Sequence, residues 1–400
     1  MKKVLFISTV DFTDNAVTRV ITGLRNGIGK YGWDSIFAVG RHCKNGSADI
    51  VIGNSIDSYV HALGSRLFDT EGRHSEGSTK DFISSISRLD IDLIHIHNLH
   101  GHYFHYPTLF KWVRCSKTPI IITLHDTWLL TGHCTTYYHQ GCNVPYDCQT
   151  CKKSYNEYPW SWRISQIFGQ RKENLRLKRE LIFENDNIKF VAVSDWLRNE
   201  VIKTGLTDNV ITIHNGIDCE IFHPKKKLCG EGFKILFITH NWESWKCLES
   251  VIEFSKHLHI DETITLVGNV YGKKLPDNIR HIENISDINA LLTLYNEHDL
   301  LISPSLAETF GMTVLEAMSC GLPVIVNNSA ALPEIVSNSA GLITDTSNML
   351  MLRNAVDTVR ADYSKYTPSE YAKSSFSDSI MCKKYAELYK MMFYNIKKQP

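Results

Sequence analysis

Short runs of apolar, often β-branched residues recur along the chain, and each is followed by a segment long enough for an amphipathic helix. In the first half the runs cover residues 4–10, 35–39, 93–96, 120–124 and 189–193. In the second half they cover residues 234–239, 263–267, 281–282, 300–303, 324–327 and 342–343. Strands that are apolar on both faces and alternate with helices are typical of parallel sheets covered on both sides. The pattern therefore predicts an α/β protein with two doubly wound halves.

The two halves are expected to meet near residue 222. A Lys-rich stretch with two glycines follows at residues 225–232 and suits an exposed linker. We therefore expect an N-terminal domain at residues 1–222, a C-terminal domain at 223–370 and a final helical segment at 371–400. Ligands of open parallel sheets bind beyond the carboxyl ends of the strands, so chemistry-bearing residues are expected just after the apolar runs.

Composition and charge exclude several classes of protein. The 43 basic and 43 acidic residues balance, whereas a dedicated nucleic-acid-binding protein carries a basic surplus. No apolar run approaches the ~20 residues needed to span a bilayer. The first ten residues lack a signal-peptide cleavage site and are interpreted as a strand. Eleven cysteines, mostly scattered, do not suggest a disulfide framework, and they favour a cytoplasmic protein.

Two carboxylates stand eight residues apart in the segment 303–325, with Glu308 in a turn and Glu316 inside the helix that follows. The first backbone amides of that helix would be unpaired and partly positive, which suits a diphosphate. These amides belong to Gly311, Met312, Thr313 and Val314. Glu316 could then accept hydrogen bonds from ribose hydroxyls, and Glu308 could contact a sugar or stabilise positive charge at its anomeric carbon.

The same segment contains, in order, Pro-Ser, Glu308, Phe-Gly, Glu-Ala-Met, Cys-Gly and Pro-Val. This order resembles the E-x7-E signature of the family 4 retaining glycosyltransferases. The resemblance implies a GT-B fold, in which two Rossmann-like domains face each other across a cleft. It also implies transfer of a sugar from a nucleotide donor with retention at the anomeric carbon, without a catalytic metal. Residues 371–400 then resemble the C-terminal helix that, in this architecture, crosses back to the N-terminal domain.

Residues 98–103 and 123–134 are similar to a branch of the family that acts in bacterial exopolysaccharide assembly, including colanic-acid-type enzymes. His125 follows an apolar run directly, and the resemblance favours a contact with the donor sugar or reaction centre. The alternative is a hydrogen-bonded histidine near the core. Asp126 is expected either to orient His125 or to cap the next helix.

The chain departs from the family pattern in two places. Many members carry a Gly-Gly pair after the first strand, where this chain has residues 11–16, including the acceptor-side candidates Asp14 and Asn15. Members commonly place an Arg and then a Lys-Gly after the first strand of the second domain. Here Lys246 fits the lysine, His240 stands where the arginine is expected, and Cys247 replaces the glycine. Because neutral histidine is a weaker phosphate partner than arginine, Lys246 would carry most of the charge clamp, unless it is simply a solvent-facing lysine.

Residues 132–180 form an expected insertion in the first domain. Its four cysteines, Cys134, Cys142, Cys148 and Cys151, end in a Cys-x2-Cys pair that suits a structural zinc, with disulfides or reduced thiols as the alternatives. Residues 152–180 hold eight basic residues against three acidic ones, interleaved with aromatic and aliphatic side chains. This mixture fits either contact with an anionic membrane surface or a solvated helix face.

Together these features predict a retaining glycosyltransferase that needs no cofactor for catalysis. Its donor would be a UDP- or GDP-sugar and its acceptor a lipid-linked bacterial glycan at the cytoplasmic face of the inner membrane. No nucleic-acid partner is expected. The missing Gly-Gly pair and arginine favour one alternative, a catalytically inactive nucleotide-sugar-binding or scaffold protein of a polysaccharide assembly complex.

Overall fold

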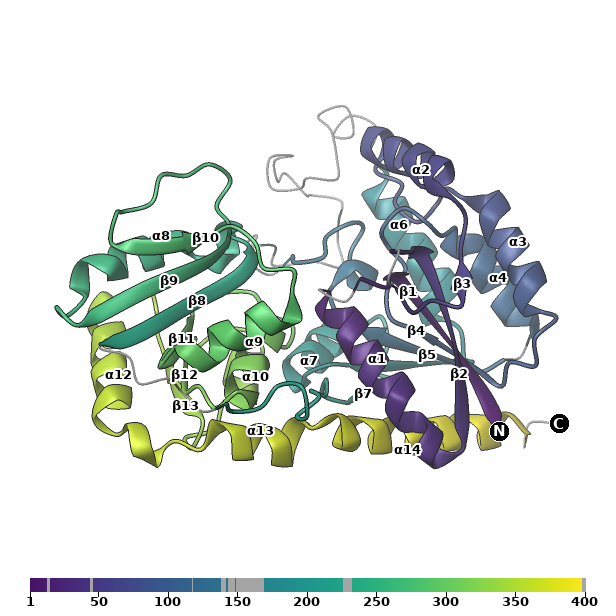
Figure 1. Ribbon diagram of the computed structural model, residues 1–400. Helices are drawn as coiled ribbons and strands as arrows, with labels where there is room; N and C mark the ends of the chain where they lie inside the picture. The colour runs from purple at the N-terminus through teal and green to yellow at the C-terminus, as the bar shows by residue number, and fades with distance from the viewer. Residues whose placement is uncertain are drawn as a thin grey trace. The chain divides into compact units, whose positions relative to one another are not determined.

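The computed structural model describes residues 1–12, 15–43, 46–116, 118–137, 142, 148, 169–225 and 232–397. The chain forms two compact units (Figure 1). Unit 1 comprises Met1–Val193, Leu197–Ile213 and Cys382–Pro400, and unit 2 comprises Ser194–Trp196 and His214–Met381. The chain therefore enters unit 2 before residue 222. Among the described helices, none combines the length and the apolar character that a membrane span requires.

Unit 1 is built on a seven-stranded sheet. Its strands are β1 (Lys2–Val10), β2 (Trp33–Arg41), β3 (Ile50–Val51), β4 (Leu93–Ile96), β5 (Ile120–Leu124), β6 (Ile188–Ala192) and β7 (Val210–Thr212). Its α-helices are α1 (Ala16–Ile28), α2 (Ser55–Phe68), α3 (Glu76–Ile86), α4 (Tyr106–Ser116) and α6 (Arg171–Lys178), with most of α7 (Asp195–Lys203) and α14 (Asp378–Lys397). Short 3-10 turns lie at Gly29–Tyr31 and Trp128–Leu130, and a π-helical turn lies at Arg179–Phe183.

Unit 2 is built on a six-stranded sheet. Its strands are β8 (Phe233–Asn241), β9 (Glu262–Asn269), β10 (Ile279–Ile282), β11 (Leu300–Ser303), β12 (Val324–Asn327) and β13 (Gly341–Thr344). Its α-helices are α8 (Leu248–Phe254), α9 (Ile288–Glu297), α10 (Met312–Ser319), α11 (Leu332–Ile335), α12 (Met349–Ala361) and α13 (Pro368–Phe376). Its 3-10 turns lie at Ser244–Lys246, Ser255–His257 and Tyr363–Lys365.

The strand order reverses once in each sheet. Unit 1 has the order β3-β2-β1-β4-β5-β6-β7 and unit 2 the order β10-β9-β8-β11-β12-β13, with all pairings parallel. The connections after β1 and β4, and those after β8 and β11, therefore lead away from each other. Such reversals are the switch points at which open α/β sheets bind ligands.

The apolar pattern predicted these sheets well. The eleven apolar runs of the sequence coincide with eleven of the strands, one run to each strand. The apolar side chains of these strands fill the core of each unit. The pattern missed β3 and β7, which are edge strands of two and three residues and too short for a periodic signal. The expected final helix is two helices, because Ser377 adopts an extended backbone between α13 and α14.

Helix α14 starts in unit 2 and belongs to unit 1 from Cys382 onwards. Two of its tyrosines hydrogen-bond polar groups in the middle of the unit 1 sheet. The Tyr389 hydroxyl lies 2.6 Å from His95 Nδ1, and the Tyr385 hydroxyl lies 2.8 Å from Thr123 Oγ1. His95 Nε2 in turn lies 2.7 Å from Thr123 Oγ1, so these buried polar groups satisfy one another.

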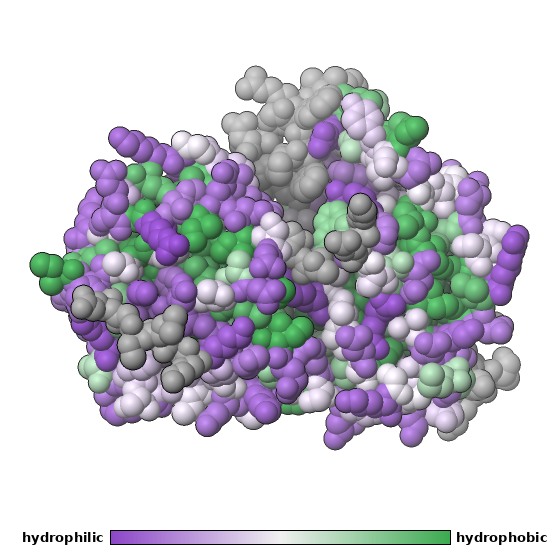
Figure 2. All heavy atoms as spheres, in the orientation of Figure 1, coloured by the Kyte–Doolittle hydropathy of each residue, from purple (hydrophilic) through white to green (hydrophobic). Residues whose placement is uncertain are grey.

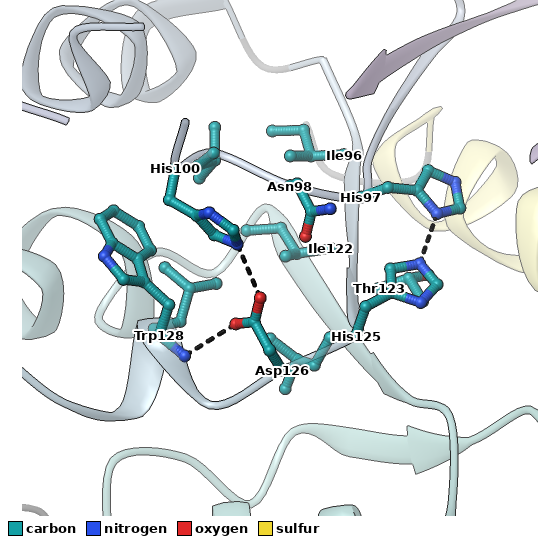
Figure 3. A pocket seen from close by; sticks show the side chains of 12 residues that line it. Ile96, His97, Asn98, His100, Ile122, Thr123, His125, Asp126 and Trp128 are labelled. Carbon is teal, nitrogen blue, oxygen red and sulfur yellow. Dashed lines mark hydrogen bonds and ion pairs between the residues drawn. The ribbon is translucent and has the colours of Figure 1, made fainter. Parts of the chain in front are cut away.

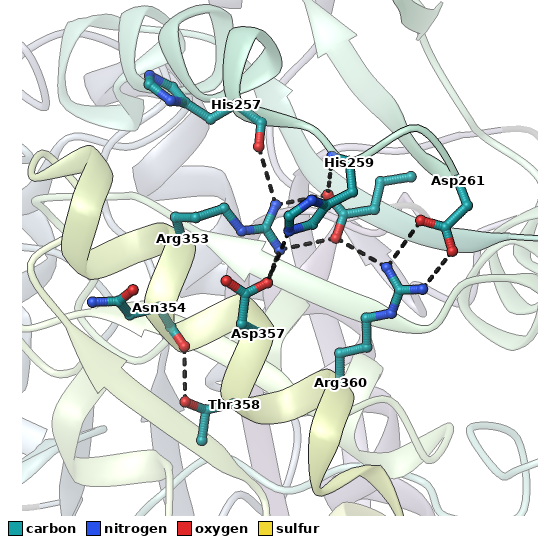
Figure 4. A network of polar contacts seen from close by, with 9 residues as sticks. His257, His259, Asp261, Arg353, Asn354, Asp357, Thr358 and Arg360 are labelled. Atoms are coloured by element: carbon teal, nitrogen blue, oxygen red, sulfur yellow. Dashed lines mark hydrogen bonds and ion pairs between the residues drawn. The ribbon is translucent and has the colours of Figure 1, made fainter.

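In unit 2 a charged network ties α12 to the start of β9 (Figure 4). The Glu262 side chain is fully buried, and both of its oxygens accept hydrogen bonds from Arg353, at 2.6 and 2.8 Å. The His259 amide donates to the same carboxylate at 2.9 Å. Arg360, which is more exposed, bonds mainly Asp261 at the surface. Removing an arginine that binds a buried carboxylate through two hydrogen bonds strongly destabilises the folded protein.

We expect Arg353→Met to lower the free energy of unfolding by about 3 kcal/mol, because it leaves Glu262 as a buried charge with a single remaining strong donor. Arg360→Met is the matched control, and its loss of a surface pair should cost less than about 1 kcal/mol. Urea unfolding followed by circular dichroism measures both. Equal losses in the two variants would contradict the assignment.

Cys247 precedes α8 with φ of 58°, in the left-handed region that favours glycine. The family pattern has glycine at this position. Because a residue with a Cβ is strained at positive φ, the cysteine carries backbone strain. We expect Cys247→Gly to raise the free energy of unfolding by up to about 1 kcal/mol, whereas Cys247→Ala, which keeps a Cβ, should not. A glycine variant no more stable than the alanine variant in the same urea assay would show that the strain is negligible.

Candidate active site

The switch point of unit 2 brings together two residues that are far apart in the sequence. Lys246 lies in the 3-10 turn after β8, Glu308 lies in the loop after β11, and the two side chains form an ion pair. They are 18% and 20% exposed, so the pair is sheltered yet reachable by a ligand. The Leu306 amide donates to the Trp245 carbonyl at 2.8 Å, which fixes the two loops to each other.

Gly311 is the N-cap of helix α10 and follows Glu308 by three residues. Its φ is 103°, a left-handed conformation that favours glycine, and a Cβ there would also lie 2.9 Å from the end of the Leu332 side chain, which would have to move. One of the four amides predicted to be unpaired is in fact bonded, because the Val314 amide donates to the Gly311 carbonyl at 3.0 Å as the first turn tightens. The amides of Gly311, Met312 and Thr313 donate no hydrogen bond to any described residue. They make the start of the helix partly positive.

The second carboxylate of the signature is buried. Glu316 is 1% exposed and accepts a hydrogen bond from the Tyr295 hydroxyl of α9 at 2.9 Å. Its role toward a ribose stays a prediction. His240 was expected after the strand but is the second-last residue of β8; it is exposed, and its phosphate role also stays a prediction.

Glu243 was not among the sequence candidates. Burial raises the pKa of its carboxyl, Lys246 opposes this shift, and the charge of Glu308 reinforces it. Unit 2 therefore presents one lysine beside two carboxylates, one of which is biased toward its protonated form. The only signal for Glu243 was its place in the loop between β8 and Lys246.

Unit 1 has a cavity of about 290 Å³ at its own switch point. Thr9 and Val10 at the end of β1 line it together with Asn98 and residues 100–102, which follow β4. The two segments touch closely, since the Thr9 hydroxyl donates to the His100 carbonyl at 2.6 Å and a Cβ on Gly101 would lie 2.3 Å from Thr9. Asn15 also lines the cavity, and its side chain caps α1 by accepting from the Thr18 amide at 3.2 Å.

Glu71 and His102 line the same cavity and were not identified from the sequence. One Glu71 oxygen accepts from the amides of Gly101 and His102, each at 2.8 Å, and the other contacts the His102 ring. Burial alone would raise the pKa of Glu71, but the hydrogen bonds and charge of His102 hold it well below its usual range. His102 adopts φ of 64°, a strained conformation of the kind that clusters at functional sites.

His61, Glu71 and His102 offer ligand atoms within 4.8 Å of one another. Both ring nitrogens of His61 already have partners, because Nε2 accepts from the Gly72 amide at 3.1 Å and Nδ1 lies 2.9 Å from the Ser75 hydroxyl. Binding a metal here would strip the Gly72 amide of its acceptor. The cluster is therefore better described as a hydrogen-bonded network.

His125 lies directly after β5, and its Nε2 lies 2.8 Å from His97 Nδ1 with the two rings stacked (Figure 3). Burial lowers the pKa of His125 to about 4, the charge of Asp126 opposes this shift, and the charge of His100 adds to it. His125 is therefore neutral near pH 7. It can exchange a hydrogen bond with a ligand but does not supply a positive charge.

Asp126 does not orient His125, contrary to one of the two expectations. Its Oδ2 lies 2.6 Å from His100 Nε2, and its Oδ1 accepts from the Trp128 amide at 2.8 Å (Figure 3). The second expectation is not met either, because the 3-10 turn Trp128–Leu130 has Thr127 at its N-cap and no side-chain cap. The bond from the Trp128 amide to Asp126, two residues earlier, is an Asx turn that shapes the loop. The loop after β4 places His100 beside Asp126, whose charge raises the pKa of His100 although burial acts against it.

The cysteine insertion and one acceptor-side candidate are only partly within the described residues. Cys151 and Asp14 lie outside them. Cys134 is buried, and the Gly132 amide lies 3.2 Å from the sulfur of Cys148. Burial raises the pKa of Cys148, the Gly132 amide opposes the shift, and the charge of Cys134 adds to it. The zinc site, with Cys142 as a further ligand, stays a prediction.

Comparisons with known proteins agree with this geometry. A family model described as Glycosyltransferase Family 4 matches residues 15–221, and one described as Glycosyl transferases group 1 matches residues 220–374. WcaC of Escherichia coli strain K12, a putative colanic acid biosynthesis glycosyl transferase, is 22% identical over 276 residues, which cover 64% of this chain and 65% of WcaC. The curated relatives that the chain matches are thus each covered over less than two thirds of their length.

Solved structures share the fold over nearly the whole chain. Sucrose-phosphate synthase from Thermosynechococcus elongatus has a TM-score of 0.72 at 15% identity, over 99% of this chain and 100% of that one. HepE of Anabaena, in complex with UDP and glucose, has a TM-score of 0.67 at 15% identity, over 98% and 100%. These likenesses show two Rossmann-like units of the GT-B class. Since the Glycosyltransferase Family 4 model alone matches more than half of the residues of this chain, the chain belongs to glycosyltransferase family 4.

Proposed function

We propose that this protein is a retaining glycosyltransferase that uses a UDP- or GDP-sugar and requires no metal. The observation that carries the proposal is the Lys246–Glu308 pair at the switch point of unit 2, next to the start of α10. A lysine and a helix start suit a diphosphate, and a carboxylate beside them suits the sugar attached to it. HepE has been crystallised with UDP-glucose, which supports a nucleotide-sugar donor here.

In this proposal Lys246 and the amides of residues 311–313 bind the diphosphate. They stabilise the negative charge that develops as the bond between the anomeric carbon and the diphosphate oxygen breaks. Glu308 stabilises the positive charge on the sugar. The acceptor hydroxyl forms the new bond on the same face of the sugar, and its proton passes to the departing diphosphate. Because cationic groups of the protein assist the leaving group, no metal ion is needed.

The cavity of unit 1 is proposed to hold one sugar ring of the acceptor. Its volume of about 290 Å³ is close to the lower limit of small-ligand pockets. Phe12 and Trp128 give it apolar walls, while Asn98, His100 and Glu71 add polar groups that could bond hydroxyls. His125, outside this cavity and neutral, is proposed to bond a hydroxyl of the donor sugar. The name of WcaC, a putative colanic acid biosynthesis glycosyl transferase, supports a role in bacterial polysaccharide synthesis. That the acceptor is lipid-linked is part of the proposal.

Glu308→Gln is expected to cut turnover about a hundredfold or more while leaving the Kd for UDP within about threefold, because the lost charge acts on the transition state rather than on the diphosphate. Release of UDP or GDP from a panel of nucleotide sugars, with a bacterial membrane extract as acceptor source, measures turnover. Glu249→Gln, at an exposed carboxylate of α8, is the matched control. Unchanged turnover in Glu308→Gln would refute its role. Donor binding without turnover in the unaltered protein would favour the scaffold alternative.

Lys246→Met should weaken UDP binding about 10- to 100-fold, because it removes a charge-assisted contact to the diphosphate. Isothermal titration calorimetry with UDP and with GDP measures the effect and identifies the base. Lys273→Met, which removes a solvent-exposed lysine of unit 2, should bind UDP like the unaltered protein. Equal affinities for both variants would show that Lys246 is a solvent-facing residue without a phosphate role.

A further inference from the structure

Helix α2 exposes its apolar side and buries its polar side. Besides Phe68 at its last position, which is 46% exposed, its exposed apolar residues are four: Ile56, Tyr59, Val60 and Leu63, at 77, 72, 57 and 39% exposure. These four follow an i, i+3, i+4, i+7 spacing and so share one face of the helix, which we call the α2 apolar face. The residues of α2 that are buried are His61 and Ser65. Figure 2 shows hydrophobic surface over α2.

Polar contacts lock this orientation. His61 is fully buried and uses both ring nitrogens, one with Ser75 and one with the Gly72 amide. The Asn54 side chain caps the helix by accepting from the Asp57 amide at 2.9 Å, and Asp69 ends it by donating its amide to Ser65 at 2.8 Å. Rolling the helix to bury the α2 apolar face would break the bonds of His61 inside the protein. The apolar face therefore stays on the surface.

We propose that the α2 apolar face rests on a phospholipid bilayer. The face carries no charge, because the charged residues of the helix, Asp57 and Arg66, lie half-buried on its flanks. It consists of aliphatic side chains and one tyrosine, a residue suited to the membrane–water interface. Four side chains of one helix offer less than the ~800 Å² that each partner buries in a stable protein interface. A membrane needs no such complementary area.

The position of α2 relates this surface to the proposed acceptor. The opposite side of the same helix contributes Ser65 to the cavity of unit 1, and Asp69 just after the helix also lines it. This inference rests on the proposed function, since a lipid-linked acceptor would bring its sugar to that cavity while its lipid stays in the bilayer. Helix α2 would then lie between the cavity and the membrane surface.

The basic stretch 152–180 was the sequence-based expectation for a membrane contact, and that role stays a prediction. Only residues 169–180 of it are described; among them Lys172 and Arg179 are exposed, whereas two other basic side chains have partners within the protein. Lys178 is fully buried and donates to the carbonyls of Trp128 and Thr131 at 2.6 and 2.9 Å. Burial lowers its pKa to about 7. Arg176 is paired with Glu173 and Glu180 on its own helical segment. The uncharged face of α2 carries the proposal instead.

Sedimentation with unilamellar vesicles tests the proposal, using phosphatidylcholine alone and phosphatidylcholine mixed with phosphatidylglycerol. The protein is expected to bind both, and raising the salt from about 0.1 M to about 0.5 M should change binding less than about twofold, because apolar insertion is not screened. The triple variant Ile56→Ser, Tyr59→Ser, Leu63→Ser should lose at least about tenfold in partition. Ile260→Ser with Leu350→Ser, at exposed apolar residues of unit 2, is the matched control and should bind like the unaltered protein.

UDP affinity and the unfolding midpoint are measured on every variant and should not change, since the altered residues are exposed and lie outside the donor site. Failure of the unaltered protein to bind vesicles, or equal binding by the triple variant, would overturn the proposal. A dimer in solution that the triple variant abolishes would also overturn it, by assigning the face to a second copy. Vesicle binding without nucleotide-sugar turnover would refute the proposed function while leaving the membrane contact standing.

Discussion

The reversal of strand order in each parallel sheet is the constraint on which both candidate sites depend. A parallel sheet can continue on either side of its first strand, and in each unit the chain uses both sides, so β1 lies between β2 and β4 and β8 lies between β9 and β11. The loops that leave the two central strands diverge and leave room between them. In unit 2 that point holds Lys246 and Glu308, and in unit 1 it holds a cavity.

The charged residues at the two switch points have different partners. In unit 2 a lysine and a carboxylate are close but partly exposed, so in the proposed function an incoming diphosphate would compete for the lysine. In unit 1 carboxylates are matched with histidines, Glu71 with His102 and Asp126 with His100. His125 stays neutral beside them because burial outweighs the attraction of Asp126. This difference is why the proposed function assigns the charged diphosphate to unit 2 and neutral hydroxyls to unit 1.

Two residues stand where simple pattern rules would not place them. Cys247 adopts a left-handed backbone that glycine would take without strain, and His102 does the same at the cavity. Helix α2 departs from the usual amphipathic arrangement, since buried His61 makes its polar side the inner one. In each case a local rule is broken next to one of the candidate sites or the surface beside it, which is where such exceptions are expected.

Much of the fold was readable from the sequence, because strands buried on both faces must be apolar throughout and helices must lie between them. The turn and helix start around Glu308 and Gly311 were also predictable, since they follow from local spacing. The sequence did not reveal β3 and β7, the partnership of Asp126 with His100, or the roles of Glu71 and His102. These depend on which loops meet at a sheet edge and on how deeply each group is buried.

By itself the sequence determined the two parallel-sheet halves, the signature by which the chain resembles its family, and Lys246 and Glu308 as candidates. Only the tertiary structure decided that these two side chains pair, that the Val314 amide is already bonded, and that α2 turns its apolar face outward. The physical reason is that strand and helix patterns are set by neighbours in sequence. Pairing, burial and ionisation are set by neighbours in space.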